Sequence, residues 1–253
     1  MLPDTEFTHR VVLVTGAAQG IGAEIARSFV QAGADVHLAD LDREGVEKTA
    51  AELGVASRAL DLSDQAATGE LVRSIHDEKG RVDILVHAAG GVRGQVGRPI
   101  EEVSLADWRK IFAANVDSAF CLAQAVAPIM KESGWGRIIN ISSGAGLRPS
   151  LTGIQAYAAA KHALVGLTRQ LSQELGPFGI TVNSVAPGLI LSNPSSRKQW
   201  DNYSDAVQNE ILEATHTRRL GEPEDIAAAV LYFASAAAGW ASGQILSVDG
   251  GRS

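Results

Sequence analysis

Short apolar runs rich in β-branched residues alternate with longer segments of helical periodicity along most of the chain. The first run, residues 11–15, is followed by a glycine-containing turn and by a segment, 21–31, whose apolar residues recur at helical spacing. Six further runs predict strands, at residues 35–40, 56–60, 82–87, 137–141, 181–185 and 245–248. Because the runs are apolar rather than alternating, we expect helices to cover both faces of each strand.

Repeated strand–helix–strand units require crossover connections, which are right-handed and place the strands parallel. The sequence therefore predicts an α/β fold with a doubly wound parallel sheet of about seven strands and helices on both faces. A chain of 253 residues with 45% hydrophobic residues fits one domain around one core. We expect residues 1–253 to form that single domain.

Charge and cysteine content exclude several classes of function. Lys and Arg number 22 against 29 Asp and Glu, a net charge of -7, so we expect no nucleic-acid partner. Cys121 is the lone cysteine, and no Cys and His spacing suggests a metal site. The first ten residues lack an apolar core and no later run reaches ~18 apolar residues, so we expect no membrane span and a cytoplasmic location.

A glycine-rich turn separates the first strand from the first helix. It contains Gly16, Gln19, Gly20, Ile21 and Gly22. Glycines permit a tight turn and a close approach of the backbone to a pyrophosphate, while the helix amino terminus favours negative charge. This context predicts a dinucleotide site.

Asp40 ends the second strand, 18 residues beyond Gly22. A carboxylate there can accept hydrogen bonds from ribose hydroxyls, but it would repel a 2'-phosphate by up to ~4 kcal/mol at ~4 Å and an effective dielectric of 20. Gln19 stands in the turn where a cation could offset that repulsion. The sequence therefore favours NAD over NADP as the cofactor.

Tyr157 and Lys161 are separated by four residues in a helical segment, which puts both side chains on one face. A phenol titrates near ~10, and a neighbouring ammonium stabilises its anion, so we expect Lys161 to lower the pKa of Tyr157. Such a pair is common on ordinary helices and gains meaning only from its context.

That context resembles the short-chain dehydrogenase/reductase family in its single-domain form, from Arg10 to Gly251. The resemblance rests on ordered motifs: TGAAQGIG at 15–22, Asp40, Asp61-Leu62, HAAG at 87–90, Asn115, IINISS at 138–143, YAAAK at 157–161, PGLILS at 187–192 and SVDGG at 247–251. The resemblance implies a Rossmann-type fold, an NAD(P) cofactor and a homotetramer.

By this resemblance, Tyr157 is the acid/base that exchanges a proton with the substrate oxygen, and Lys161 lowers its pKa and holds the nicotinamide ribose. Ser143 would stabilise charge on the same oxygen. Asn115 would bend a helix and hold a water linked to Lys161. The residues that the family pattern places along the cofactor are Gly16, Gln19, Gly20, Ile21, Gly22, Asp40, Asp61, Leu62, Ala89, Gly90, Tyr157, Lys161, Pro187, Gly188, Ile190 and Ser192.

The chain departs from the family pattern in two places. His87 and Ala88 stand where the family has paired asparagines, which puts in question how that loop is braced; we interpret His87 as structural. Ser143 lies one residue further from the tyrosine than is usual, so Ser142 is a minor alternative.

Substrate recognition is expected from loops at the carboxyl edge of the sheet. Arg93, Arg148 and Gln155 are candidate contacts, because arginine suits carboxylates and glutamine suits hydroxyls. The polar segment 192–216 is a candidate substrate lid, or else a solvated insertion.

These features together predict an NAD-dependent oxidoreductase that interconverts a polar secondary alcohol, of the sugar, polyol or hydroxy acid type, and its ketone. Two alternatives stay open. One is an NADPH-dependent reductase of 3-oxoacyl thioesters, and the other is a non-catalytic dinucleotide-binding sensor.

Overall fold

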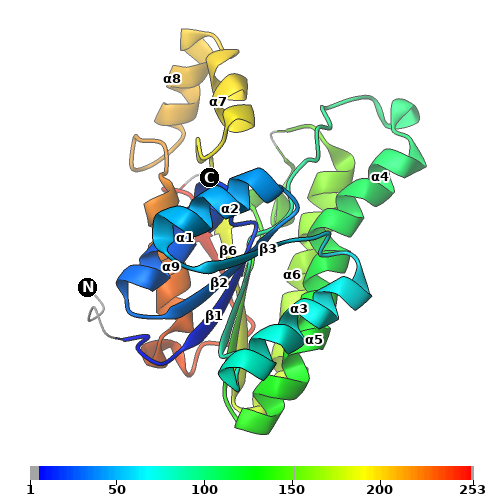
Figure 1. Ribbon diagram of the computed structural model, residues 1–253. Helices are drawn as coiled ribbons and strands as arrows, with labels where there is room; N and C mark the ends of the chain where they lie inside the picture. The colour runs from blue at the N-terminus through cyan, green and yellow to red at the C-terminus, as the bar shows by residue number, and fades with distance from the viewer. Residues whose placement is uncertain (1–5, 151, 252–253) are drawn as a thin grey trace.

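The computed structural model describes residues 6–150 and 152–251, and its centre is one parallel sheet (Figure 1). The strands lie in the order β3-β2-β1-β4-β5-β6-β7. Their bounds are β1 Val11–Thr15, β2 Asp35–Asp40, β3 Ala56–Ala59, β4 Ile84–His87, β5 Gly136–Ile141, β6 Ile180–Pro187 and β7 Ile245–Val248. The predicted doubly wound sheet of seven parallel strands is confirmed, with ends that differ by one or two residues.

Helices cover both faces of this sheet. Their bounds are α1 Gly20–Gln31, α2 Arg43–Leu53, α3 Gln65–Lys79, α4 Leu105–Phe112, α5 Ser118–Ser133, α6 Gln155–Leu175, α7 Pro194–Asp201, α8 Asp205–Glu213 and α9 Pro223–Ala234. Short helical segments lie at η1 Ile100–Glu102, η2 Ala113–Asp117, η3 Gly144–Gly146, η4 Gly176–Phe178 and η5 Ala236–Ala238, of which η2 is a π-helix.

Successive residues of each central strand enter two different cores. Val12 and Val14 pack with α1 and α9, whereas Val11 and Leu13 pack with α3 and α5 on the opposite face. Both sides of β1 are therefore buried, which is why its residues 11–14 form an uninterrupted apolar run.

The stretch Leu105–Ser133, comprising α4, η2 and α5, is long and apolar enough to cross a membrane by length and composition alone. Its residues Leu122, Val126 and Met130 are fully buried in the core shared with the sheet. The apolar character of this stretch is that of a core helix.

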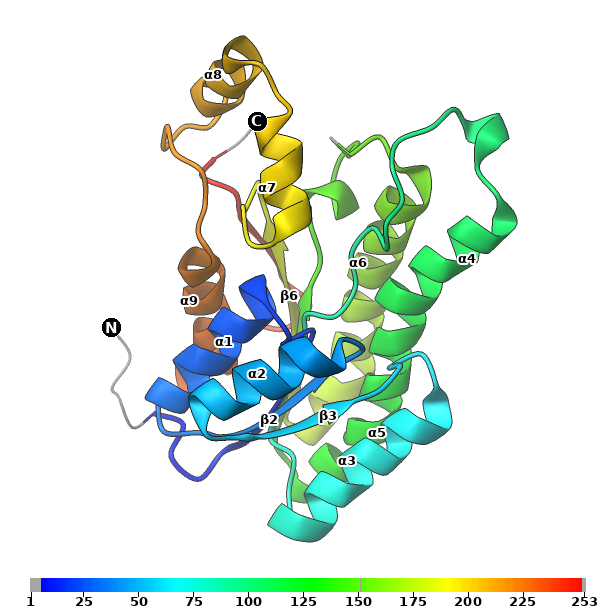
Figure 2. The ribbon, with the colours of Figure 1, turned by 45° about the horizontal axis from the view of Figure 1, so that its top comes forward.

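Two helices, α7 and α8, stand beyond the carboxyl ends of the strands, apart from the layers that cover the sheet (Figure 2). They make up most of the polar segment 192–216. This arrangement leaves the sheet's carboxyl edge between α7 and α8 on one side and α4 on the other.

Candidate active site

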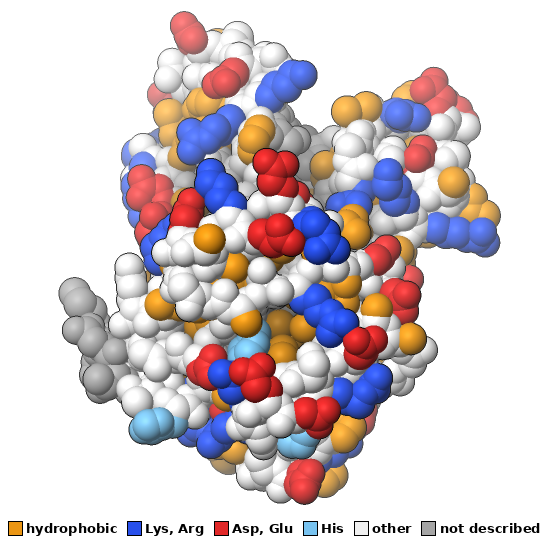
Figure 3. Space-filling model, in the orientation of Figure 1, with side chains coloured by type: hydrophobic (Ala, Val, Ile, Leu, Met, Phe, Trp, Pro, Cys, Tyr) orange, Lys and Arg blue, Asp and Glu red, His pale blue; other side chains and the backbone are white. Residues whose placement is uncertain are grey.

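A cavity of about 910 Å³ lies at the carboxyl edge of the sheet, where loops following several strands meet. The space-filling view shows the molecule hollowed between its α7–α8 part and its α4 side (Figure 3). Every residue predicted to contact the cofactor lines this cavity. The volume lies within the range of small-molecule sites and towards its upper end.

The turn between β1 and α1 forms one wall of the cavity. Gly16 has φ 69°, and a Cβ there would lie 2.5 Å from the carbonyl carbon of Ala88. Gly20 has φ 60° and abuts the carbonyl oxygen of Ser192, so the turn touches the loops after β4 and β6. Helix α1 has no side-chain cap, whereas α2 and α3 are capped by aspartates. The uncapped N–H groups of α1 suit an anion.

Asp40 lies beside this turn at the end of β2. Its Oδ2 accepts a hydrogen bond from Ala18 N at 3.0 Å, and its Oδ1 accepts one from Asp42 N at 3.0 Å. These bonds fix the carboxylate at the cavity wall, where Asp42 and Asp61 also lie. This end of the cavity is therefore acidic.

Tyr157 and Lys161 extend from α6 into the cavity, opposite Ser143 at the end of β5. The Ser143 and Tyr157 side chains are hydrogen bonded. Lys161 Nζ lies 5.7 Å from the centroid of the Tyr157 ring and donates to the carbonyl of Ile141 at 2.9 Å. The structure thus brings the three predicted catalytic side chains to one place.

Burial dominates the protonation of this group. It raises the pKa of Tyr157, against the opposing effect of the Ser143 hydrogen bond, and lowers the pKa of Lys161 to about 8. The expectation that Lys161 lowers the pKa of Tyr157 is therefore wrong for the protein alone. The ammonium is held at the Ile141 carbonyl, and desolvation of the phenol outweighs the remaining influences.

Asn115 lies behind the cavity wall, fully buried in the π-helical segment η2. Its Nδ2 donates to the carbonyls of Gly91 at 2.9 Å and Ile111 at 2.8 Å, and its Oδ1 accepts from Gly91 N at 2.9 Å. The side chain therefore ties the loop after β4 to the bulge between α4 and α5.

His87 braces the same region from the end of β4. It is fully buried, with Nε2 2.9 Å from Ser118 Oγ, and Ser118 Oγ donates to the carbonyl of Ala114 at 2.8 Å. Burial, and to a lesser degree the charge of Lys161, lowers the pKa of His87 to about 3. The imidazole is therefore neutral at physiological pH, and His87 with Ser118 holds α5 against the sheet.

The two candidate serines differ in what they contact. Ser142 Oγ donates to the carbonyl of Val185 at 3.1 Å and accepts from Ser184 at 2.8 Å, so it belongs to the sheet. Ser143 is the residue hydrogen bonded to Tyr157.

Of the three candidate substrate contacts, Arg93 and Arg148 line the cavity and Gln155 is not among its lining residues. Gln155 is the first residue of α6, and its side chain donates to the carbonyl of Arg98 at 2.7 Å. Arg148 Nη2 lies 3.1 Å from Asp249 Oδ2, an ion pair between residues far apart in the sequence.

Several residues of the cavity wall were not singled out from the sequence, among them Lys110, Ser118 and Ile211. Tyr203 and Ile211 lie in the segment 192–216, whose polar and aromatic composition was the available signal. In residues 6–150 and 152–251 no group of three His, Cys, Asp or Glu side chains is placed to hold a metal ion.

Comparison with known proteins agrees with this geometry. A family model described as enoyl-(acyl carrier protein) reductase matches residues 16–253. A (2S)-[(R)-hydroxy(phenyl)methyl]succinyl-CoA dehydrogenase subunit of Thauera aromatica is 40% identical over 97% of each chain. A D-threitol dehydrogenase of Mycolicibacterium smegmatis is 39% identical over 98% of this chain and 94% of that protein.

The solved structure of a 7α-hydroxysteroid dehydrogenase complexed with NADH and 7-oxo glycochenodeoxycholic acid superposes with a TM-score of 0.88. It is 35% identical, and the match covers 98% of this chain and 96% of that one. The chain belongs to the short-chain dehydrogenase/reductase family, and it is an oxidoreductase of that family.

Proposed function

We propose that the protein is an NAD-dependent dehydrogenase that interconverts a polar secondary alcohol and its ketone. The observation that carries this proposal is the hydrogen-bonded pair Ser143 and Tyr157, with Lys161 on the same helix face, in a cavity whose other end is the glycine turn and Asp40. The relatives that act on alcohols, such as the D-threitol dehydrogenase, support the reaction class.

The cavity fits a dinucleotide, because the turn presents uncapped N–H groups and small residues where a pyrophosphate needs close approach. In the bound state the cofactor gives or accepts the hydride. The glycine turn would hold its phosphates, Asp40 its adenosine ribose, and Lys161 the ribose near the reacting centre.

Tyr157 supplies the proton to the substrate oxygen during ketone reduction and takes it back during alcohol oxidation. Ser143 donates a hydrogen bond to the same oxygen and stabilises its partial negative charge. Asn115 ties the loop after β4 to the helix bulge beside Lys161. The proton then moves between Tyr157 and solvent by way of Lys161. Residues 192–216 would act as a lid, because Tyr203 and Ile211 already form part of the wall.

NAD is preferred over NADP because Asp40 and Asp42 both line the adenosine end of the cavity, where a 2'-phosphate would meet two carboxylates. The test is a panel of sugars, polyols and hydroxy acids with the corresponding ketones, followed by NADH absorbance and repeated with NADPH. Faster turnover with NADPH would overturn the cofactor assignment. Binding of NADH without turnover of any panel member would favour a sensor.

A reductase of 3-oxoacyl thioesters is a second candidate, favoured by the acyl carrier protein substrate in the description of the matching family model and by the CoA thioester named for the Thauera relative. Short 3-oxoacyl thioesters added to the same panel separate the two candidates.

We also propose that the chain assembles as a homotetramer. Trp240 is 100% exposed, and Leu246 is exposed on β7, the last strand of the sheet. An apolar surface beside an open sheet edge suits contact with a second copy. Sedimentation of the wild type and of Trp240→Ser measures the number of subunits in the assembly. The substitution should reduce that number.

A further inference from the structure

The half of the cavity beside Ser143 and Tyr157, where a substrate would bind, carries an ion pair. This pair affects which substrate charges the site accepts. Arg148 lines the wall, and its Nε and Nη2 lie 3.8 Å from where a Cβ of residue 144 would stand, next to Ser143. Its partner Asp249 is only 12% exposed and is not among the lining residues, so the carboxylate lies behind the guanidinium. The positive charge of Arg148 at this wall is thus already countered by Asp249.

The Asp249 carboxylate is fixed in place by its own turn. Its Oδ1 accepts from Gly251 N at 3.0 Å while its Oδ2 contacts Arg148 at 3.1 Å. The turn follows β7, whose Val248 carbonyl accepts from Gly188 N at 3.0 Å in the loop beside the cavity. Asp249 therefore cannot easily swing away when a ligand arrives.

The other cations of this half of the cavity are placed differently. Arg93 and Lys110 line the cavity but are exposed, where water and salt screen their charge. Lys161 is held at the Ile141 carbonyl on the cofactor side. The Arg148 side chain is itself 37% exposed, but it is held by Asp249 and lies beside residue 144, so it is the paired cation of this wall that a substrate group beside Ser143 would meet.

We propose that Asp249 is a specificity-determining residue that makes the site select uncharged, hydroxylated substrates over their carboxylate analogues. This inference rests on the proposed function and narrows its substrate class. A carboxylate near Arg148 would be repelled by Asp249, whereas a hydroxyl can accept a hydrogen bond from the paired guanidinium with little such repulsion. Selectivity then comes from a built-in repulsive element.

The test uses matched substrate pairs that differ by a terminal CH₂OH or carboxylate: threitol and threonate, 1,2-propanediol and lactate, glycerol and glycerate. We expect the wild type to have the higher kcat/KM for the uncharged member. Asp249→Asn keeps an acceptor for Gly251 N and removes the charge, so the ratio should shift by about tenfold toward the carboxylate. Arg148→Gln combined with Asp249→Asn should return the ratio toward that of the wild type.

Asp225→Asn is the matched control, because it removes the carboxylate of another arginine–aspartate pair, that of Arg219, outside the cavity lining and leaves the Arg148 pair intact. Its ratio should equal that of the wild type. NADH binding and the thermal midpoint, measured for each variant, establish that it is folded.

Three results would overturn the inference. The first is an unchanged ratio of kcat/KM between the two members of a pair in Asp249→Asn. The second is an equal loss of kcat/KM for both members, which would mean that Asp249 has a purely structural role. The third is a wild type that prefers the carboxylate members. Turnover of no member of any pair and of no member of the wider panel by the wild type would instead overturn the proposed function, and the inference would fall with it.

Discussion

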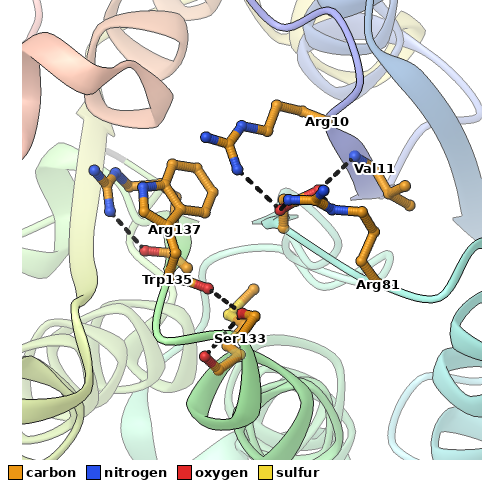
Figure 4. Close-up of polar contacts among 9 residues, drawn as sticks. Arg10, Val11, Arg81, Ser133, Trp135 and Arg137 are labelled. Atoms are coloured by element: carbon orange, nitrogen blue, oxygen red, sulfur yellow. Dashed lines mark hydrogen bonds and ion pairs between the residues drawn. The ribbon is translucent and has the colours of Figure 1, made fainter.

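At the amino edge of the sheet, the buried Asp83 carboxylate accepts hydrogen bonds from Arg10, Arg81 and the backbone N–H of Val11 (Figure 4). At the carboxyl edge, the equally buried Lys161 donates to a carbonyl and otherwise borders a cavity. The Asp83 carboxylate is buried and pairs with two arginines whose side chains are partly exposed, whereas burial lowers the pKa of Lys161 to about 8.

Buried ionisable groups thus have different surroundings at the two edges of the sheet. A carboxylate surrounded by donors contributes to stability and has no group left for a ligand. A phenol and an ammonium whose pKa values are shifted by burial, and which face a cavity, are suited to exchange protons with a ligand. Substitutions at the carboxyl edge should therefore change rates, and those at the amino edge should change stability.

Tyr157→Phe should have the largest effect, a loss of about 10²- to 10⁴-fold in turnover, because the acid/base hydroxyl is removed. NADH binding, followed by fluorescence titration, should stay close to that of the wild type, and so should the thermal midpoint. A variant that keeps more than a tenth of the wild-type turnover would contradict the proton route through Tyr157.

Asp83→Asn should lower the free energy of unfolding by about 2 to 3 kcal/mol, because charge-assisted hydrogen bonds from two arginines are weakened. Turnover at saturating substrate should be unchanged. Urea denaturation measures the first quantity. The control is Glu47→Gln, which breaks the exposed pair with Arg43 and should cost about 0.5 kcal/mol or less. A rate defect in Asp83→Asn without a loss of stability would erase the distinction between the two edges.

The fold was predictable because its signals are local. Mostly apolar runs predicted the strands, and the turn from Gly16 to Gly22 lies at the cavity at the carboxyl edge of the sheet. The errors lie mainly at ends: residues 82 and 83 fall before β4, although Asp83 N donates to the Val11 carbonyl, and β6 extends to Pro187. Strand ends depend on pairing with neighbours, which a single sequence does not contain.

The candidate site was predictable only where a motif carried it. The pairing of Arg148 with Asp249 joins residues 101 positions apart, and no pattern in either segment indicates the other. Gln155 was expected at the substrate, but this first residue of α6 donates to the backbone carbonyl of Arg98. The direction of the Tyr157 pKa depends on burial, which the spacing of Tyr157 and Lys161 does not reveal.

The raised pKa of Tyr157 predicts opposite pH profiles for the two reaction directions. Alcohol oxidation needs the phenolate, so kcat/KM should rise about tenfold per pH unit until the pH reaches the pKa of the phenol. Ketone reduction needs the phenol, so it should stay level over that range and fall above it.

Ser143→Ala removes the hydrogen bond that lowers the pKa of Tyr157, and the midpoint of both profiles should move to higher pH. Ser142→Ala is the control, since Ser142 bonds to Ser184 and Val185. A midpoint that moves to lower pH in Ser143→Ala would contradict the assignment.

Trp135→Leu should have the smallest effect, a loss of about 1 kcal/mol of stability. The guanidiniums of Arg10 and Arg137 lie 3.8 and 4.4 Å from its ring centroid. Arg10 is partly exposed and Arg137 is buried, and a cation–π contact contributes about 0.5 to 1 kcal/mol where the cation is exposed. Burial and the charge of Arg10 lower the pKa of Arg137, which has no acidic partner among the described residues, so the ring shields two like charges.

Trp135→Phe keeps an aromatic face and should retain most of that stability, while both variants should turn over substrate like the wild type. Salt screens the repulsion between the two guanidiniums. The difference in the free energy of unfolding between Trp135→Leu and Trp135→Phe should therefore become smaller as ionic strength rises. A gap that is independent of salt would mean that the ring acts here through apolar packing alone, and the amino edge would then owe its stability to Asp83 rather than to the cations around Trp135.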